Sequence, residues 1–269
     1  MAGFNVLEAP VRTVWVPVNY NAVTLYVGQL VVVSRGGSST GGAIAYTQSG
    51  STVKPFGVIV GTNNKEPLFS SSYNSEYITS VQAQADQLAR KAAGLGMTGG
   101  GMWVPAEPAA MVKVAVIGSA TIMEGKIFAG AYGTAQTEAV VSSASTTGAS
   151  VTCATTGFNF TSTSYNATLF SRTGLNSGLY RVVTTGAAGT SAQASTLYWP
   201  YDTTVGDKFV GAPLALGSCK MVMDSLGTYI DGNAAISSNY TAVEVLELDL
   251  REKGKERAIF RFTEVQAET

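Results

Sequence analysis

Short apolar runs separated by Gly, Ser, Thr and Asn make up most of the chain. One run, residues 26–33 (Tyr-Val-Gly-Gln-Leu-Val-Val-Val), has a glycine near its start and is rich in β-branched residues. A run of this length and composition predicts a strand in the core of a small barrel. Residues 56–61 are similar, and we expect them to pair antiparallel with residues 25–33, with a further strand at residues 110–117. Residues 21–138 therefore predict a β-barrel domain.

A glycine, a polar residue and an apolar strand follow one another three times, beginning at Gly28, Gly125 and Gly206. The recurrence predicts a turn followed by a strand, reused as a building block of the barrel framework. We expect the polar residues after these glycines to lie at barrel corners. The spacing is not constant, so the pattern does not define a repeat protein.

Residues 1–20 predict an extended N-terminal arm. Pro10 and Pro17 interrupt any helix, and valines alternate with other residues from position 14 to 18. Proline suits an edge strand because it cannot donate to a ladder. The arm is either an edge strand of its own domain or a strand lent to a neighbouring chain. We expect it to reach adjacent subunits.

Residues 75–93 predict one short helix, since apolar residues recur at helical spacing and Gly94 can end it. The helix belongs to an excursion over residues 62–108, which continues through a glycine-rich stretch to Trp103. Residues 139–200 are rich in Ser, Thr, Ala and Gly, and predict an inserted β lobe with strands near 149–154, 167–170 and 179–184. Residues 201–269 return to the β body and end in a charged hairpin. The predicted fold class is all-β, with a small barrel or sandwich body.

Composition points to large interfaces. Of 269 residues, 45% are hydrophobic and 13% are charged, against a usual charged share of about 25%. So few charges cover a surface poorly, which favours contacts with other chains. The net charge of −1 gives no reason to expect nucleic-acid binding, and no apolar run or N-terminal pattern predicts a membrane span or signal peptide. For Cys153 and Cys219 we expect two buried thiols, although a disulfide between them stays open.

Catalytic chemistry has little support in the sequence. The chain contains no histidine, which removes the commonest general base and metal ligand, so we expect no enzyme activity, metal or cofactor. Residues 94–99 match a dinucleotide fingerprint by letters but follow a predicted helix, so we expect a loop there. Glu124, Asp207 and Asp224 are candidate glycosidase carboxylates, but turn positions explain two of them. Aromatic residues such as Tyr198 and Tyr201 can stack on sugars or pack against protein.

Three stretches resemble structural proteins of tailed-bacteriophage particles, and most closely the head decoration or cement proteins. They are residues 26–33 with 55–61, residues 112–117 leading to 124–128, and residues 198–262, notably Leu-Glu-Leu-Asp-Leu-Arg-Glu-Lys-Gly at 246–254. The resemblance covers about half the chain, and the Ser/Thr-rich insertion departs from the compact members of such families. It implies a small barrel that forms a homo-oligomer, most often a trimer, and carries no catalytic residues.

The resemblance also implies a function. The chain is expected to bind the major capsid protein on the outside of the capsid, bridging neighbouring capsomers after assembly in the host cytoplasm. Alternatives are a tail-tube or head-fibre subunit, or a carbohydrate-binding or adhesin module with the 139–200 lobe as its binding face. A major capsid protein needs more helix than this chain predicts. The candidate partner-contact residues are Phe4, Val14, Trp15, Val16, Trp103, Tyr198 and Trp199.

Overall fold

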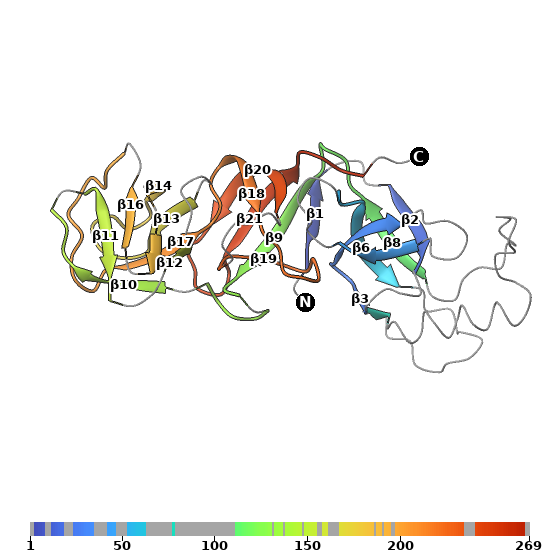
Figure 1. Ribbon diagram of the computed structural model, residues 1–269, viewed down its shortest axis with the longest axis horizontal. Coiled ribbons are helices and arrows are strands. Elements are labelled where there is room, and N and C mark those ends of the chain that lie inside the picture. Colours follow the sequence, from blue (N-terminus) through green and yellow to red (C-terminus); the bar gives the residue numbers. More distant parts are fainter. Residues whose placement is uncertain are drawn as a thin grey trace, which may run out of the picture.

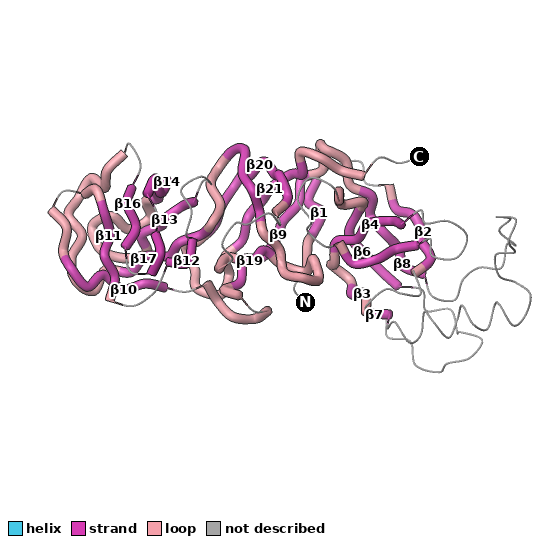
Figure 2. Tube along the Cα trace, viewed as in Figure 1, coloured by secondary structure: helices cyan, strands magenta, loops and turns pink. Residues whose placement is uncertain are grey.

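The chain forms three β units that follow one another along the long axis of the molecule (Figure 1). The computed structural model describes residues 3–8, 12–18, 24–34, 42–46, 53–62, 77–78, 111–130, 132–136, 138–146, 148–154, 158–160, 167–185, 187–189, 191–194, 197–233 and 240–266. These residues contain no helix, and strands and loops account for all of them (Figure 2). The fold is all-β, as the sequence predicts.

The N-terminal unit is a curled five-stranded sheet. In hydrogen-bonded order its strands are β2 (Thr13–Pro17), β8 (Met111–Val116), β6 (Gly57–Thr62), β4 (Leu30–Ser34) and β5 (Gly42–Ala45). Leu30 lies opposite Val58 in an antiparallel ladder, which confirms the predicted pairing of the two apolar runs. A parallel bridge from Val18 to Ala43 connects the two edges of the sheet, so the sheet nearly closes on its own aliphatic core.

Two residues of the expected helix are in a strand instead. β7 (Tyr77–Ile78) pairs antiparallel with β3 (Leu25–Tyr26). Ile78 is fully buried in the core of the N-terminal unit, and this long-range packing outweighs the helical spacing. The prediction of a helix is therefore wrong at these two positions, and the rest of the expected helix lies outside the described residues.

The middle unit is a sheet that collects strands from both ends of the chain. In order, its strands are β1 (Asn5–Glu8), β9 (Ile122–Phe128), β21 (Arg257–Phe262), β20 (Thr241–Asp249) and β18 (Gly217–Met221), and β19 (Ile230–Asp231) pairs parallel with β9. The hairpin β20–β21 is the predicted charged hairpin.

The described part of the N-terminal arm lies in the chain's own sheets. β1 is an edge strand of the middle sheet and β2 is an edge strand of the N-terminal sheet. The sequence left open whether the arm is an edge strand of its own domain or a strand lent to a neighbouring chain. In the structure, its described strands are edge strands of the chain's own sheets. As edge strands, β1 and β2 are each paired along one side within the described residues, and the expected contact with adjacent subunits stays a prediction.

The third unit is a closed six-stranded barrel that includes the predicted lobe. Its strands, in order around the barrel, are β10 (Glu138–Ser143), β11 (Ser150–Cys153), β16 (Ser191–Ala194), β14 (Tyr180–Thr185), β13 (Ala167–Ser171) and β17 (Lys208–Ala212); outside it, β12 (Phe158–Phe160) pairs with β15 (Ala187–Gly189). β17 pairs with both β10 and β13 and so closes the barrel. The unit therefore extends to Ala212, beyond the expected range 139–200.

Two of the three recurring glycine patterns form the same turn. The backbone N–H groups of Gln29 and Asp207 donate to the carbonyl oxygens of Tyr26 and Thr204, three residues earlier. In return, each polar side chain accepts a hydrogen bond from that earlier residue's N–H, at 2.9 Å in both turns. The glycine before the polar residue has a φ of 87° in the first turn and 98° in the second, a region that favours glycine. Both polar side chains are buried corner residues.

The third pattern has a different role. Gly125 lies inside strand β9, where a Cβ atom would come within 2.6 Å of the Phe4 ring and 3.0 Å of Ile230. Glycine is thus needed at this position for close packing, and Lys126 beside it is exposed on a strand. The prediction of a turn at Gly125 is wrong because the sequence pattern does not distinguish a turn glycine from a packing glycine.

One hydrophobic cluster joins all three units. It contains Leu30 and Val58 from the N-terminal sheet, Phe260 from the middle sheet, and Phe170 and Val210 from the barrel. Alternate residues of β13 and β17 point the other way and fill the barrel interior, which follows from the two-residue period of a strand. The outer faces of these two strands therefore attach the barrel to the middle sheet.

Candidate functional site

The predicted contact residues do not gather at one place. Phe4, Val16 and Trp199 are buried, Val14 is half-buried, Trp15 and Tyr198 are 49% and 60% exposed, and Trp103 lies outside the described residues. Phe4 packs edge-on against Phe260 at 5.9 Å, over Gly125. Phe4 and Val16 are therefore core residues of their sheets and are wrong as partner-contact residues.

Trp199 belongs to the barrel core. Its ring lies edge-on to Phe209 at 5.1 Å, and the Arg181 guanidinium carbon lies 5.3 Å from its ring centroid. Such stacking fixes the loop that carries Trp199. Its neighbours in sequence, Leu197 and Tyr198, point outward and are exposed.

Two loops of the barrel display a group of exposed apolar side chains, which we call the barrel-loop surface. The loops run between β13 and β14 and before β17. The surface consists of Leu175, Leu197, Tyr198, Tyr201 and Val205 on these loops, together with Tyr180, the first residue of β14. The exposed fractions range from 50% at Tyr180 to 71% at Leu175. Exposed apolar residues that occur singly are ordinary, whereas a group on adjoining loops marks an interaction surface.

A buried asparagine connects the two loops. The Asn176 side-chain amide donates to the Tyr201 carbonyl oxygen at 2.9 Å, and its oxygen accepts from the Tyr201 N–H at 3.2 Å. Asn176 is fully buried, so this pair of hydrogen bonds is shielded from water. The backbones that carry Leu175 and Tyr201 are thereby held side by side.

Arg181 and Asp207 hold the rest of the surface in place. Arg181 donates from Nε to the Tyr198 carbonyl oxygen at 3.1 Å and from Nη1 to the Tyr180 carbonyl oxygen at 2.8 Å. The Asp207 carboxylate lies so close to Gly174 that a side chain there would collide with it. The loops are therefore locked by polar groups beneath them, while their apolar side chains face outward.

A buried arginine joins the barrel to the middle sheet. Arg172 donates to the carboxylates of Glu256 at 2.6 Å and Glu138 at 3.1 Å, and to the Leu250 carbonyl oxygen at 3.0 Å. The side chains of Arg172 and Glu256 are 5% and 0% exposed. Burial raises the pKa of Glu138, but the hydrogen bonds and charges of Arg172 and Lys208 outweigh it and leave that pKa below its ordinary value. The buried guanidinium has a partner at each of its three nitrogen atoms.

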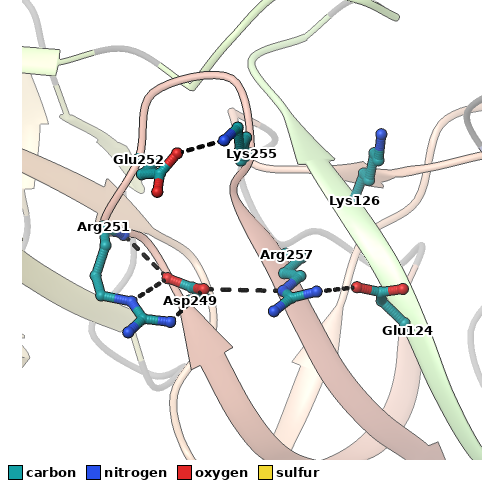
Figure 3. Close-up of a pocket in the computed structure, with 7 residues that line it drawn as sticks. All are labelled: Glu124, Lys126, Asp249, Arg251, Glu252, Lys255 and Arg257. Atoms are coloured by element: carbon teal, nitrogen blue, oxygen red, sulfur yellow. Dashed lines mark hydrogen bonds and ion pairs between the residues drawn. The ribbon is translucent and has the colours of Figure 1, made fainter. Parts of the chain in front are cut away.

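The middle sheet carries an open depression of about 470 Å³ that is lined only by charged side chains (Figure 3). They are Glu124, Lys126, Asp249, Arg251, Glu252, Lys255 and Arg257. Arg257 donates to Glu124 at 2.7 Å, and its Nε lies 3.8 Å from Asp249. The Arg251 guanidinium donates two hydrogen bonds to the Asp249 carboxylate, from Nε at 2.9 Å and from Nη2 at 2.7 Å.

These ion pairs determine what the depression can do. Hydrogen bonds from Arg251, outweighing partial burial, lower the pKa of Asp249 to about 2, so its carboxylate stays ionised. Glu252 and Lys255 pair at 2.6 Å, and Lys126 points away from Glu124 (Figure 3). Small-molecule sites are mostly apolar with a few polar groups. The depression instead resembles an ordered charged surface whose ions neutralise one another.

The carboxylates considered for glycoside hydrolysis have structural partners. Glu124 is bound by Arg257, and Asp207 closes the turn before β17. Asp224 accepts from the N–H groups of Thr228 at 2.5 Å and Tyr229 at 3.0 Å, and so caps its own turn. These three carboxylates therefore do not lie together as the acid and the nucleophile of a glycosidase.

Within the described residues, no group of three or more Cys, Asp or Glu side chains is arranged to hold a metal ion. Neither is any helix among them long and apolar enough to cross a membrane. Cys153 and Cys219 are both buried thiols and are not joined by a disulfide. No family model, curated protein or solved structure matches this chain.

Sequence reasoning missed most of the barrel-loop surface. It identified Tyr198 and considered Tyr201 for sugar stacking, but not Leu175, Leu197 or Val205. A signal was present, because Leu175 lies in the turn-forming stretch Gly-Leu-Asn-Ser-Gly at 174–178, where an aliphatic residue has no core to enter.

Proposed function

We propose that this chain is a non-enzymatic structural protein of a tailed-phage particle, which decorates the capsid and stabilises it by binding neighbouring protein chains. The barrel-loop surface carries the proposal, because it presents six apolar side chains on loops that are held rigid from below. A rigid apolar surface loses little conformational entropy when it is covered by another protein.

The charge distribution supports a role in assembly. Residues 138–212, the span of the barrel, contain six charged residues: Glu138, Arg172, Arg181, Asp202, Asp207 and Lys208. The side chains of Arg172 and Asp207 are buried, and Glu138 pairs with both Arg172 and Lys208. Most of the barrel surface is therefore neutral, rich in Ser, Thr and Tyr. Interfaces are depleted of Lys, Glu and Asp and also of Ser, so it is the scarcity of charge, and not the serine content, that matches an interface.

The choice of a phage capsid rests on the resemblance of three stretches to head decoration proteins. Cryo-electron microscopy of particles purified from the source of this chain tests it. We expect ordered copies on the outer faces of the capsid, in contact with the major capsid protein and at a fixed ratio to it. Copies confined to a tail or fibre, or particles that lack the chain, would contradict the proposal.

A carbohydrate-binding module is the second candidate, favoured by the exposed rings of Tyr180, Tyr198 and Tyr201. Leucine and valine make up the other half of the surface and do not stack on sugars. A glycan array with the full chain separates the two functions. Glycan binding that is lost on Tyr198→Ser and Tyr201→Ser, in a chain absent from particles, would favour this second function.

A further inference from the structure

We infer that the occupant of the barrel-loop surface is a second copy of this chain, which contacts the first through the same surface. This inference rests on the proposed function, because it names the partner of the surface on which that function depends. Four observations support it: the size of the surface, its lack of charge, its rigidity and the closure of the barrel beneath it.

The size of the surface suits a specific protein contact. From the exposed fractions of the six residues, at about 200 Å² per fully exposed large residue, their exposed area is on the order of 700 Å². A standard interface takes about 800 Å² from each partner, while the largest apolar patch of an ordinary monomer is about 300–600 Å². Two such surfaces facing each other would supply most of an interface without other contacts.

Because the barrel-loop surface carries few charges, it favours a partner whose contact surface is also nearly uncharged. Within residues 173–180 and 197–207, which carry the surface, the charged residues are Asp202, which is exposed, and Asp207, which is buried. Of the charged residues that flank them, Arg181 is half-buried and donates to the Tyr180 and Tyr198 carbonyl oxygens, and Lys208 is paired with Glu138 at 3.2 Å. A strongly charged partner would lose its hydration there and gain no counter-charge. A second barrel-loop surface is equally neutral, so two copies meet without desolvating many charges or placing like charges together.

The construction of the loops indicates how the contact forms. The barrel is closed, so it offers no free strand edge between β10 and β17, and another chain cannot add a strand there. Contact through the barrel-loop surface therefore uses side chains. Asn176 and Arg181 hold the loops in one arrangement before binding, which keeps the entropy cost of association low. Mixed Leu and Tyr side chains on one rigid patch can interdigitate with their own copy across a two-fold axis.

A charge-exchange experiment tests the inference on the full chain. The variants Leu175→Asp/Leu197→Asp and Leu175→Lys/Leu197→Lys place like charges on both sides of the contact. Sedimentation velocity at roughly 1–100 µM detects association with a dissociation constant in the micromolar range, and we expect the wild type to associate in this range. Each variant should raise the dissociation constant by roughly 100-fold or more. An equimolar mixture of the two variants should associate again at low salt and separate at high salt.

Leu246→Asp is the matched control, since Leu246 is an exposed leucine on β20 of the middle sheet. It should associate like the wild type. Each variant must keep the wild-type denaturation midpoint. If an aspartate variant does not, the single change Leu197→Ser replaces it, and it should also weaken association.

Several results would overturn the inference. They are a wild type that stays monomeric at 100 µM, aspartate variants that associate as well as the wild type, and a mixture that fails to associate. Binding of a neutral polysaccharide by a monomeric wild type would assign the surface to a glycan instead. The proposed function fails separately, if the particles lack the chain on their capsids, whatever its behaviour in the centrifuge.

Discussion

Arg172→Ala removes the guanidinium that joins the barrel to the β20–β21 hairpin. In the wild type the fully buried carboxylate of Glu256 accepts from Arg172 at 2.6 Å and from the Gly254 N–H at 2.7 Å. The variant leaves Glu256 with the second of these bonds and no counter-charge. Removing one partner of a buried ion pair costs about 3–5 kcal/mol, because the other charge stays uncompensated. Glu138 adds little, since Lys208 remains 3.2 Å away.

Guanidinium unfolding measures this loss. With a slope of about 5 kcal/mol per molar, the expected loss shifts the midpoint down by roughly 0.6–1.0 M. Tryptophan fluorescence is a suitable probe, because Trp199 packs against Phe209 inside the barrel. We also expect the barrel transition to separate from that of the rest of the chain, since Arg172 connects the two units.

Arg261→Ala is the matched control. Arg261 pairs with Glu244, and both side chains are more than a third exposed. Exposed pairs contribute about 0.2–1 kcal/mol. If Arg172→Ala costs no more than this control, the assignment of Arg172 as a buried connection is refuted. The double variant Arg172→Met/Glu256→Met should lose less than the two single changes added together, because it leaves neither charge alone.

Three further predictions follow from individual contacts. Gly125→Ala should lower the free energy of unfolding by about 1–3 kcal/mol, because its Cβ atom would overlap the Phe4 ring. The pKa of Asp249, about 2 when folded, lies below its unfolded value, so its stabilisation is present above about pH 4 and is lost as the pH falls toward 2; denaturation at pH 6, 4, 3 and 2 measures it. Burial raises the pKa of the Cys153 thiol to about 11, so a thiol reagent at pH 8 should label it only as fast as the chain opens.

Each of these predictions has its own check. Gly61→Ala should be nearly neutral, because the nearest atom to its Cβ would be 3.8 Å away; a cost equal to that of Gly125→Ala would disprove the packing argument. Arg251→Gln should flatten the acid dependence, and an unchanged profile would show that Asp249 is not its source. Rapid labelling of Cys153 in the native chain would contradict its burial.

Local patterns were sufficient for the class of fold and for several pairings. The alternation at residues 243–250 and the apolar runs at 25–33 and 56–61 each predict strands whose partners lie close by in sequence, and the structure has both ladders. The recurring glycine turn was also visible, at Gly28 and Gly206. Such features depend on side-chain period and turn chemistry, which a single stretch of sequence contains.

Long-range packing decided the rest. Phe4 and Gly125 are 121 positions apart and fit each other, so neither residue type reveals its role by itself. The same holds for Arg172 with Glu256, and for Asn176 with Tyr201, which brings two separate loops together. The sequence by itself determined an all-β chain with a nearly neutral lobe. Only the tertiary structure decided that the N-terminal strands complete the chain's own sheets, and that the apolar side chains left outside gather on two loops of the barrel. The reason is that the burial of a side chain depends on which distant segments pack together, and a local sequence pattern does not contain this information.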